Sequence, residues 1–204
     1  MGTAGRWEVF MACAGTGVAF LVLSAVIKGT AGGLEGLPLL ESSGPALDVS
    51  AADLGAQDFA VGLGAAGFVT VARQLLLRVW PEFAESTERS NAQVLPNLGV
   101  LDLVWVALLS GIPEEVLFRG TLIPVVAPDL RGVLASALLF GYLHKSGGRN
   151  LAFAGWASAV GFLYGSAFLV TGKIAVPAIA HSGANFLSAY LWKVQRLEKA
   201  KGRA

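Results

Sequence analysis

The sequence contains few charged residues for its length. Lysine, arginine, aspartate and glutamate make up 14% of the 204 residues, whereas soluble domains carry about 25%. Hydrophobic residues make up 54%, and the mean hydropathy is +0.63. The formal net charge is only +1, and the chain has no basic stripe and no nucleic-acid-binding motif, which excludes a nucleic-acid partner. The composition therefore predicts a polytopic membrane protein.

Cysteine and histidine are also scarce. The single cysteine, Cys13, excludes an internal disulfide framework. The only two histidines are His144 and His181, and the H-E-x-x-H spacing of many zinc hydrolases is absent. No serine or cysteine stands in a nucleophile motif. Because ionisable groups are costly at membrane depth, the positions of the two histidines are informative.

Apolar runs divide the chain into a series of expected membrane helices. Residues 9–27 carry no charge and would form a helix about 28 Å long, enough to cross a bilayer. A cleaved signal peptide is the alternative for this segment. Further apolar helices are expected at residues 59–80, 98–112, 116–127, 132–144, 151–170 and 174–192. The predicted fold class is all-α, a polytopic transmembrane helix bundle of about six to eight membrane helices.

Polar segments suggest three parts of the chain. Residues 1–58 hold the first helix and an acidic, Gly-, Ser- and Pro-rich extramembrane connection, in which a short helix could follow Ser50. Residues 59–192 form the helical membrane core. Residues 193–204 form a basic tail, which suggests a cytoplasmic or stromal C-terminus.

Two polar features lie between or at the ends of the apolar runs. Arg73 and Arg78, near the end of the second run, are expected to extend to the membrane interface. Residues 81–96 are polar and of mixed charge, which is compatible with an amphipathic helix on the membrane surface.

The segment from Gly111 to Gly120 places two adjacent carboxylates and a guanidinium inside the apolar core. Gly111-Ile112-Pro113 is expected to break or kink the chain, with Pro113 in the first turn of a new helix. In that helix Glu115 and Arg119 lie one turn apart and can pair. Glu114 points about 100° away, so it stays available for chemistry.

Two further apolar helices carry polar side chains. One ends with Phe140 and, a turn later, His144, and the other contains His181 and, a turn later, Asn185. Unsatisfied polar groups are costly inside lipid, so these side chains should converge with the glutamates. The set suits hydrolysis by activated water: glutamate can accept a proton, histidine can share that task or stabilise an oxyanion, and Asn can also donate.

These three segments resemble a known signature. Glu114-Glu115-x-x-x-Arg119, Phe140-x-x-x-His144 and His181-x-x-x-Asn185 are similar to the motifs of the CaaX protease and bacteriocin-processing (CPBP, or ABI) family of intramembrane endopeptidases. This family includes the CaaX prenyl proteases, and the resemblance covers residues 98–192. The stretch 147–165 resembles cyanobacterial and chloroplast members.

The resemblance implies a role for each motif position. Glu114 and His144 would orient and activate a water molecule, and His181 and Asn185 would form the oxyanion hole. Glu115 and Arg119 would hold the geometry of the site, and Phe140 would line the substrate pocket. The implied substrate is a peptide or protein, prenylated or membrane-embedded. The implied location is the plasma or thylakoid membrane of a bacterium or a chloroplast membrane.

Several alternatives stay open at this point. No metal is assigned, although a divalent ion such as zinc could bind Glu114, His144 and His181. The histidines and Asn185 could instead be interhelical hydrogen-bond partners. The chain could be a non-proteolytic membrane scaffold of the same fold that binds other membrane proteins. A proton-coupled transporter is disfavoured because no inverted repeat is visible.

Overall fold

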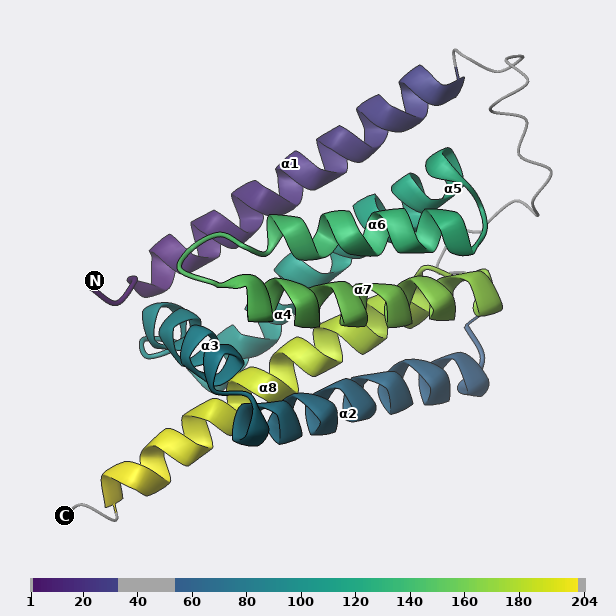
Figure 1. The fold of residues 1–204 in the computed structure, drawn as a ribbon. Helices are drawn as coiled ribbons and strands as arrows, with labels where there is room; N and C mark the ends of the chain where they lie inside the picture. The colour runs from purple at the N-terminus through teal and green to yellow at the C-terminus, as the bar shows by residue number, and fades with distance from the viewer. Residues whose placement is uncertain (1, 33–53, 202–204) are drawn as a thin grey trace.

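The fold was analysed in a computed structural model, which describes residues 2–32 and 54–201. The predicted all-α class is confirmed: these residues form a bundle of helices (Figure 1). The helices are α1 (Arg6–Gly32), α2 (Ala56–Val79), α3 (Pro81–Val94), α4 (Val100–Leu117), the π-helical turn η1 (Phe118–Leu122), α5 (Ile123–Val126), α6 (Leu130–Leu143), α7 (Leu151–Thr171) and α8 (Ala175–Lys201).

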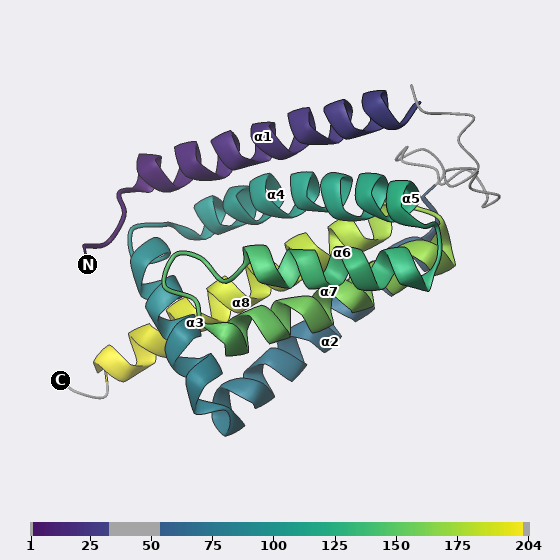
Figure 2. The ribbon, with the colours of Figure 1, turned by 45° about the horizontal axis from the view of Figure 1, so that its top comes forward.

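The helices stack side by side, with α4 and α8 packed against each other at the centre. Helix α1 covers the outer face of α4, α2 packs on α8, and α6 packs on α7. Helix α3 lies across the end of the bundle at which both termini are found (Figures 1 and 2). The centre of the bundle is therefore built from α4 and α8, which carry the first and the third motif.

Three helices within the described ranges are long and apolar enough to cross a membrane: α1, α2 and α7. Helix α6 is apolar but shorter. Large apolar side chains such as Met11 on α1 and Phe68 on α2 are exposed on the outside of the bundle, where they would contact lipid. The finding supports an integral membrane protein, whereas the higher count of six to eight membrane helices stays a prediction.

A salt bridge between Arg6 and Asp102 attaches α1 to the start of α4. Asp102 accepts hydrogen bonds from Arg6 Nε at 2.9 Å and Arg6 Nη2 at 2.7 Å. The same carboxylate accepts the backbone N–H of Gly99, which precedes the first residue of α4, at 2.9 Å. Asp102 therefore caps one helix and binds another, and α1 packs as part of the bundle.

The expected break before the glutamates is wrong. Helix α4 runs through Pro113 without interruption, so residues 98–112 and the glutamates share one helix. Gly17 of α1 lies opposite this position, and a Cβ there would be 3.1 Å from both the Leu109 carbonyl oxygen and the Pro113 ring. The missing side chain at Gly17 lets α1 pack closely over the proline, and the neighbouring helix supports the interrupted backbone ladder.

The backbone instead changes its geometry one turn later, in η1. Residues 118–122 adopt the wider π-helical turn, and Thr121 Oγ1 donates to the carbonyl of Val116 at 3.0 Å. The predicted helix at residues 116–127 thus becomes the end of α4, η1 and α5 in succession. π-Helical turns inside α-helices are frequent at functional sites, and this one carries Arg119.

The predicted surface helix and the basic tail are both helical in the structure. The predicted surface helix at 81–96 is present as α3, but it buries polar side chains: Ser86 Oγ accepts the backbone N–H of Asn150 at 3.0 Å. The last helix continues through the basic tail as far as Lys201. The short helix proposed after Ser50 lies outside the described residues.

The contact between α6 and α7 should depend on Gly141. A Cβ at this position would lie 2.5 Å from the Ala154 carbonyl oxygen, so the helices would have to separate. We expect Gly141→Ala to lower the free energy of unfolding by about 1–3 kcal/mol, the usual cost of overpacking, measured by thermal unfolding in detergent. Gly155→Ala is the matched control, because no atom lies within 4 Å of its Cβ position. Equal stability of the two variants would contradict this packing.

Candidate active site

The candidate site is centred on a buried ion pair between Glu115 of α4 and Arg119 of η1. Glu115 Oε1 accepts hydrogen bonds from Arg119 Nη1 at 2.9 Å and from His181 Nδ1 at 2.7 Å. Glu115 and Arg119 are both 0% exposed. Arg119 Nη2 also donates to the carbonyl of Gly161 on α7 at 3.0 Å. One carboxylate thus connects α4, η1 and α8, and its arginine partner extends the network to α7.

Glu114 points into a different environment. Its Oε2 atom lies 3.9 Å from His144 Nε2 and 3.8 Å from His181 Nε2. Both separations exceed the length of a direct hydrogen bond. Among the described residues, this buried oxygen has no hydrogen-bond partner. A buried carboxylate oxygen between two ring nitrogens is suited to accept a hydrogen bond from a water molecule.

His144 is positioned by the C-terminal end of α6. Its Nδ1 lies 2.7 Å from the carbonyl oxygen of Phe140, so this nitrogen must be the donor. The neutral imidazole then has its lone pair on Nε2, which faces Glu114. The Phe140 ring supports the arrangement, with its centroid 4.2 Å from that of His144 and 4.8 Å from the Arg119 guanidinium carbon.

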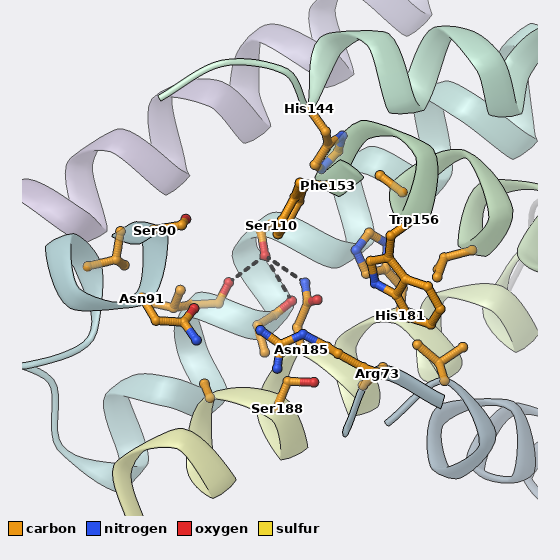
Figure 3. Close-up of a pocket in the computed structure, with 18 of the residues that line it drawn as sticks. Arg73, Ser90, Asn91, Ser110, His144, Phe153, Trp156, His181, Asn185 and Ser188 are labelled. Carbon is orange, nitrogen blue, oxygen red and sulfur yellow. Dashed lines mark hydrogen bonds between the residues drawn. The ribbon is translucent and has the colours of Figure 1, made fainter. Parts of the chain in front are cut away.

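A cavity of about 320 Å³ opens beside these groups. His144, His181 and Asn185 line it, and Figure 3 shows their side chains around one space. Asn185 Nδ2 donates to Ser110 Oγ on α4 at 3.4 Å. The structure therefore brings both histidines, Asn185 and Phe140 to one cavity, next to the two glutamates. Their chemical roles stay predictions.

Glu114 also reaches a second cavity, of about 220 Å³, between α1 and α4. Gly17 and Phe20 of α1 contribute to its wall, and Cys13 and Ser110 line both cavities. The carboxylate of Glu114 thus lies between the central cavity and the seam that α1 covers.

For three residues near the site, the sequence pattern led to either no prediction or a wrong location. Arg73 was expected to extend to the membrane interface, but it lines the central cavity, because α2 turns this face toward α8. Arg149 lines the same cavity from the loop after α6. Tyr164 of α7 is 0% exposed, and its ring centroid lies 5.4 Å from that of His181. The only sequence signal that could have assigned any of these residues to the site is a charge within an apolar run, and only Arg73 has it.

The residues that could hold a metal are Glu114, His144 and His181. No group of three His, Cys, Asp or Glu side chains in residues 2–32 and 54–201 is arranged to hold an ion. Glu114 Oε2 lies 3.8–3.9 Å from each Nε2, somewhat farther than the about 3.3–3.5 Å between two ligands of one zinc ion with bonds near 2 Å. The hydrogen bonds from the two Nδ1 atoms to Glu115 and to the Phe140 carbonyl are also found for metal-bound histidines. A metal at Glu114, His144 and His181 therefore stays a prediction.

Comparison with known proteins identifies the segment that carries the three motifs. Residues 96–187 match the family described as Type II CAAX prenyl endopeptidase Rce1-like. The match covers the chain from just before α4 to the middle of α8. No curated protein and no solved structure matches the chain.

The two adjacent glutamates should differ sharply in their effect on stability. Glu115→Gln leaves the buried Arg119 without its charged partner, so we expect the free energy of unfolding to fall by about 3–5 kcal/mol. Glu114→Gln removes a buried charge that has no hydrogen-bond partner among the described residues, so we expect a change below about 1 kcal/mol. Denaturant unfolding in detergent micelles measures both, and equal losses would contradict the assigned pairing.

Proposed function

We propose that the chain is an intramembrane endopeptidase in which Glu114 and His144 activate water, because residues 96–187 match the Type II CAAX prenyl endopeptidase Rce1-like family. The observation that carries the proposal is the position of Glu114 Oε2, buried without a partner among the described residues and 3.8–3.9 Å from two imidazole nitrogens. That site suits a water molecule more than it suits a packing contact.

In the proposed first step, Glu114 accepts a proton from the water while Nε2 of His144 accepts its second hydrogen bond. His144 holds this orientation because its Nδ1–H is bound to the Phe140 carbonyl. The water oxygen then forms a bond to the carbonyl carbon of the scissile peptide, and the carbonyl oxygen becomes an oxyanion. General base catalysis of this kind contributes about 10²- to 10⁴-fold to the rate.

His181 and Asn185 are placed to donate hydrogen bonds to that oxyanion. Nδ1–H of His181 is already bound to Glu115, so its Nε2 donates only when both ring nitrogens carry protons. Carboxylate oxygens of Glu115 and Glu114 lie 2.7 Å from Nδ1 and 3.8 Å from Nε2 of this ring. The Asn185 amide lines the same cavity one turn along α8. Collapse of the intermediate breaks the C–N bond, and protonated Glu114 returns its proton to the leaving amine.

Glu115 and Arg119 act as positioning residues in this proposal. They do not line either cavity, and their pairing fixes the rotamer of His181. We assign the substrate to the class of membrane-anchored or prenylated peptides that the family name describes. We place the protein in a plasma, thylakoid or chloroplast membrane, with the basic end of α8 on the cytoplasmic or stromal side.

Substitutions at the water site should abolish cleavage while the protein stays folded. We expect Glu114→Gln and His144→Ala each to lower kcat/KM by at least about 100-fold, because both remove a proton-transfer group. The assay uses the protein in nanodiscs, a library of membrane-anchored peptides and mass spectrometry of the products. Glu85→Gln, on the exposed face of α3, is the matched control and should keep full activity.

The alternative of a non-proteolytic scaffold gives the opposite result. If Glu114→Gln restores the phenotype of a strain that lacks the protein as well as the unaltered chain does, the proton-transfer role is contradicted. Unchanged cleavage by both variants would contradict it equally.

The proposed mechanism also predicts the response to chelation. Because Glu114, His144, His181 and Asn185 supply the proton transfers and hydrogen bonds of the scheme, we expect cleavage to persist in 1,10-phenanthroline at concentrations that strip zinc from proteins. Elemental analysis of the purified protein is the accompanying measurement. Loss of activity that added zinc restores would show that a metal takes part and would overturn this scheme.

A further inference from the structure

Two arginines line the central cavity in addition to the groups already assigned. Arg73 extends from α2 to a position beside Asn185 (Figure 3). Arg149 comes from the loop after α6; its Nε donates to Ser90 Oγ at 3.1 Å, and its guanidinium carbon lies 4.8 Å from the Phe153 ring centroid. The two guanidinium groups therefore lie in the walls of one space, together with the proposed oxyanion donors.

Neither arginine forms a salt bridge with a carboxylate in the described part of the chain, although Arg149 interacts electrostatically with Glu114. The nearby acidic side chains of α3 pair elsewhere, Glu85 with Arg89 and Glu88 with Arg196, and Glu115 pairs with Arg119. Burial lowers the pKa of the Arg149 guanidinium in its loop, which reflects the cost of removing this charge from water. The cavity wall therefore carries two positive charges, which a bound anion would balance.

A third polar group faces the same cavity. Asn91 of α3 lines it, and its Nδ2 atom is buried with no hydrogen-bond partner among the described residues. A buried donor without a partner is unfavourable, so such a group is suited to bind a ligand or an ordered water. Figure 3 shows Asn91 on α3 and Arg73 entering from α2, both away from His144. All three groups donate, and an anion is the ligand that satisfies them together.

We propose that Arg73 and Arg149, assisted by Asn91, form a subsite that binds a carboxylate of the peptide substrate. The inference rests on the proposed function, because it places the scissile bond at His181 and Asn185 and the carboxylate beyond it. Guanidinium groups bind carboxylates in bidentate geometry, which gives direction as well as affinity.

The size of the cavity limits where that carboxylate can be in the substrate. A volume of about 320 Å³ is at the lower end of ligand sites, about 300–1,000 Å³. It holds a short stretch of peptide, so the carboxylate lies within a few residues of the bond that is cut. Two sources fit this chemistry: the C-terminal carboxylate of the peptide or an Asp or Glu side chain near the cleavage point.

The test uses three versions of one membrane-anchored peptide library: with a free C-terminal carboxylate, with a C-terminal amide, and with a free carboxylate but every Asp and Glu replaced by Asn and Gln. We expect the unaltered protein in nanodiscs to prefer one source. A preference for acid over amide assigns the C-terminus, and loss of cleavage in the third library assigns the side chain. Equal kcat/KM for all three would overturn the subsite.

The variants Arg73→Gln and Arg149→Gln connect the preference to these residues. Each should lower kcat/KM for the preferred library by about 10- to 100-fold, the usual effect of losing a charge-assisted hydrogen bond. Neither should change cleavage of the library that lacks the carboxylate, a selectivity that misfolding cannot produce. Arg78→Gln is the matched control, since Arg78 is exposed on the same helix. A preference that survives in both Arg→Gln variants would contradict the inference.

Binding measurements separate this inference from the proposed function. The Glu114→Gln protein, in which hydrolysis is blocked, is titrated with fluorescently labelled acid and amide peptides in nanodiscs of neutral lipid. If selective binding disappears in Glu114→Gln/Arg73→Gln while the unaltered protein cleaves nothing, the subsite stands and the endopeptidase proposal fails. If cleavage occurs without selective binding, the endopeptidase stands and the subsite fails. Selectivity that requires anionic lipid would assign the arginines to a lipid headgroup and also overturn the subsite.

Discussion

The carboxylate of Glu115 is the group on which the rest of the site depends. It has no exposed surface, and it accepts hydrogen bonds from Arg119 and His181. A buried charge is tolerated only when it is paired and hydrogen-bonded, so α4, η1 and α8 must keep the relative positions that satisfy it. The same contacts aim Nε2 of His181 at Glu114. The structural requirement of one glutamate therefore sets the chemical geometry of its neighbour.

Backbone features make this arrangement sterically accessible. The π-helical turn η1 begins just before Arg119, and the carbonyl of Gly161 on α7 accepts a hydrogen bond from that side chain. A Cβ at Gly161 would lie 3.2 Å from Ala137 of α6, so the absence of a side chain here lets α6 approach. Packing and charge neutralisation thus depend on the same few positions.

The sequence contained much of this site because spacing along a helix is a local property. Glu115 and Arg119 are four residues apart, and their pairing followed from helix geometry. The convergence of His144 with the glutamates followed from the cost of polar groups in lipid and from the family resemblance. The break at Pro113 was wrong because proline is tolerated inside membrane helices, so an apolar run that contains one does not have to end there. Arg73 was misplaced because an apolar run does not reveal which face of α2 meets α8.

The seam between α1 and α4 has a consequence for the first part of the chain. Glu114 borders the cavity beneath α1, and Gly17 and Phe20 separate that cavity from the lipid side. Helix α1 is held there by Arg6 on Asp102 and by the close approach at Gly17. Helix α1 therefore separates the Glu114 carboxylate from the lipid hydrocarbon. Removal of α1 would place the Glu114 carboxylate next to lipid hydrocarbon, where the charge that the proposed reaction requires is costly.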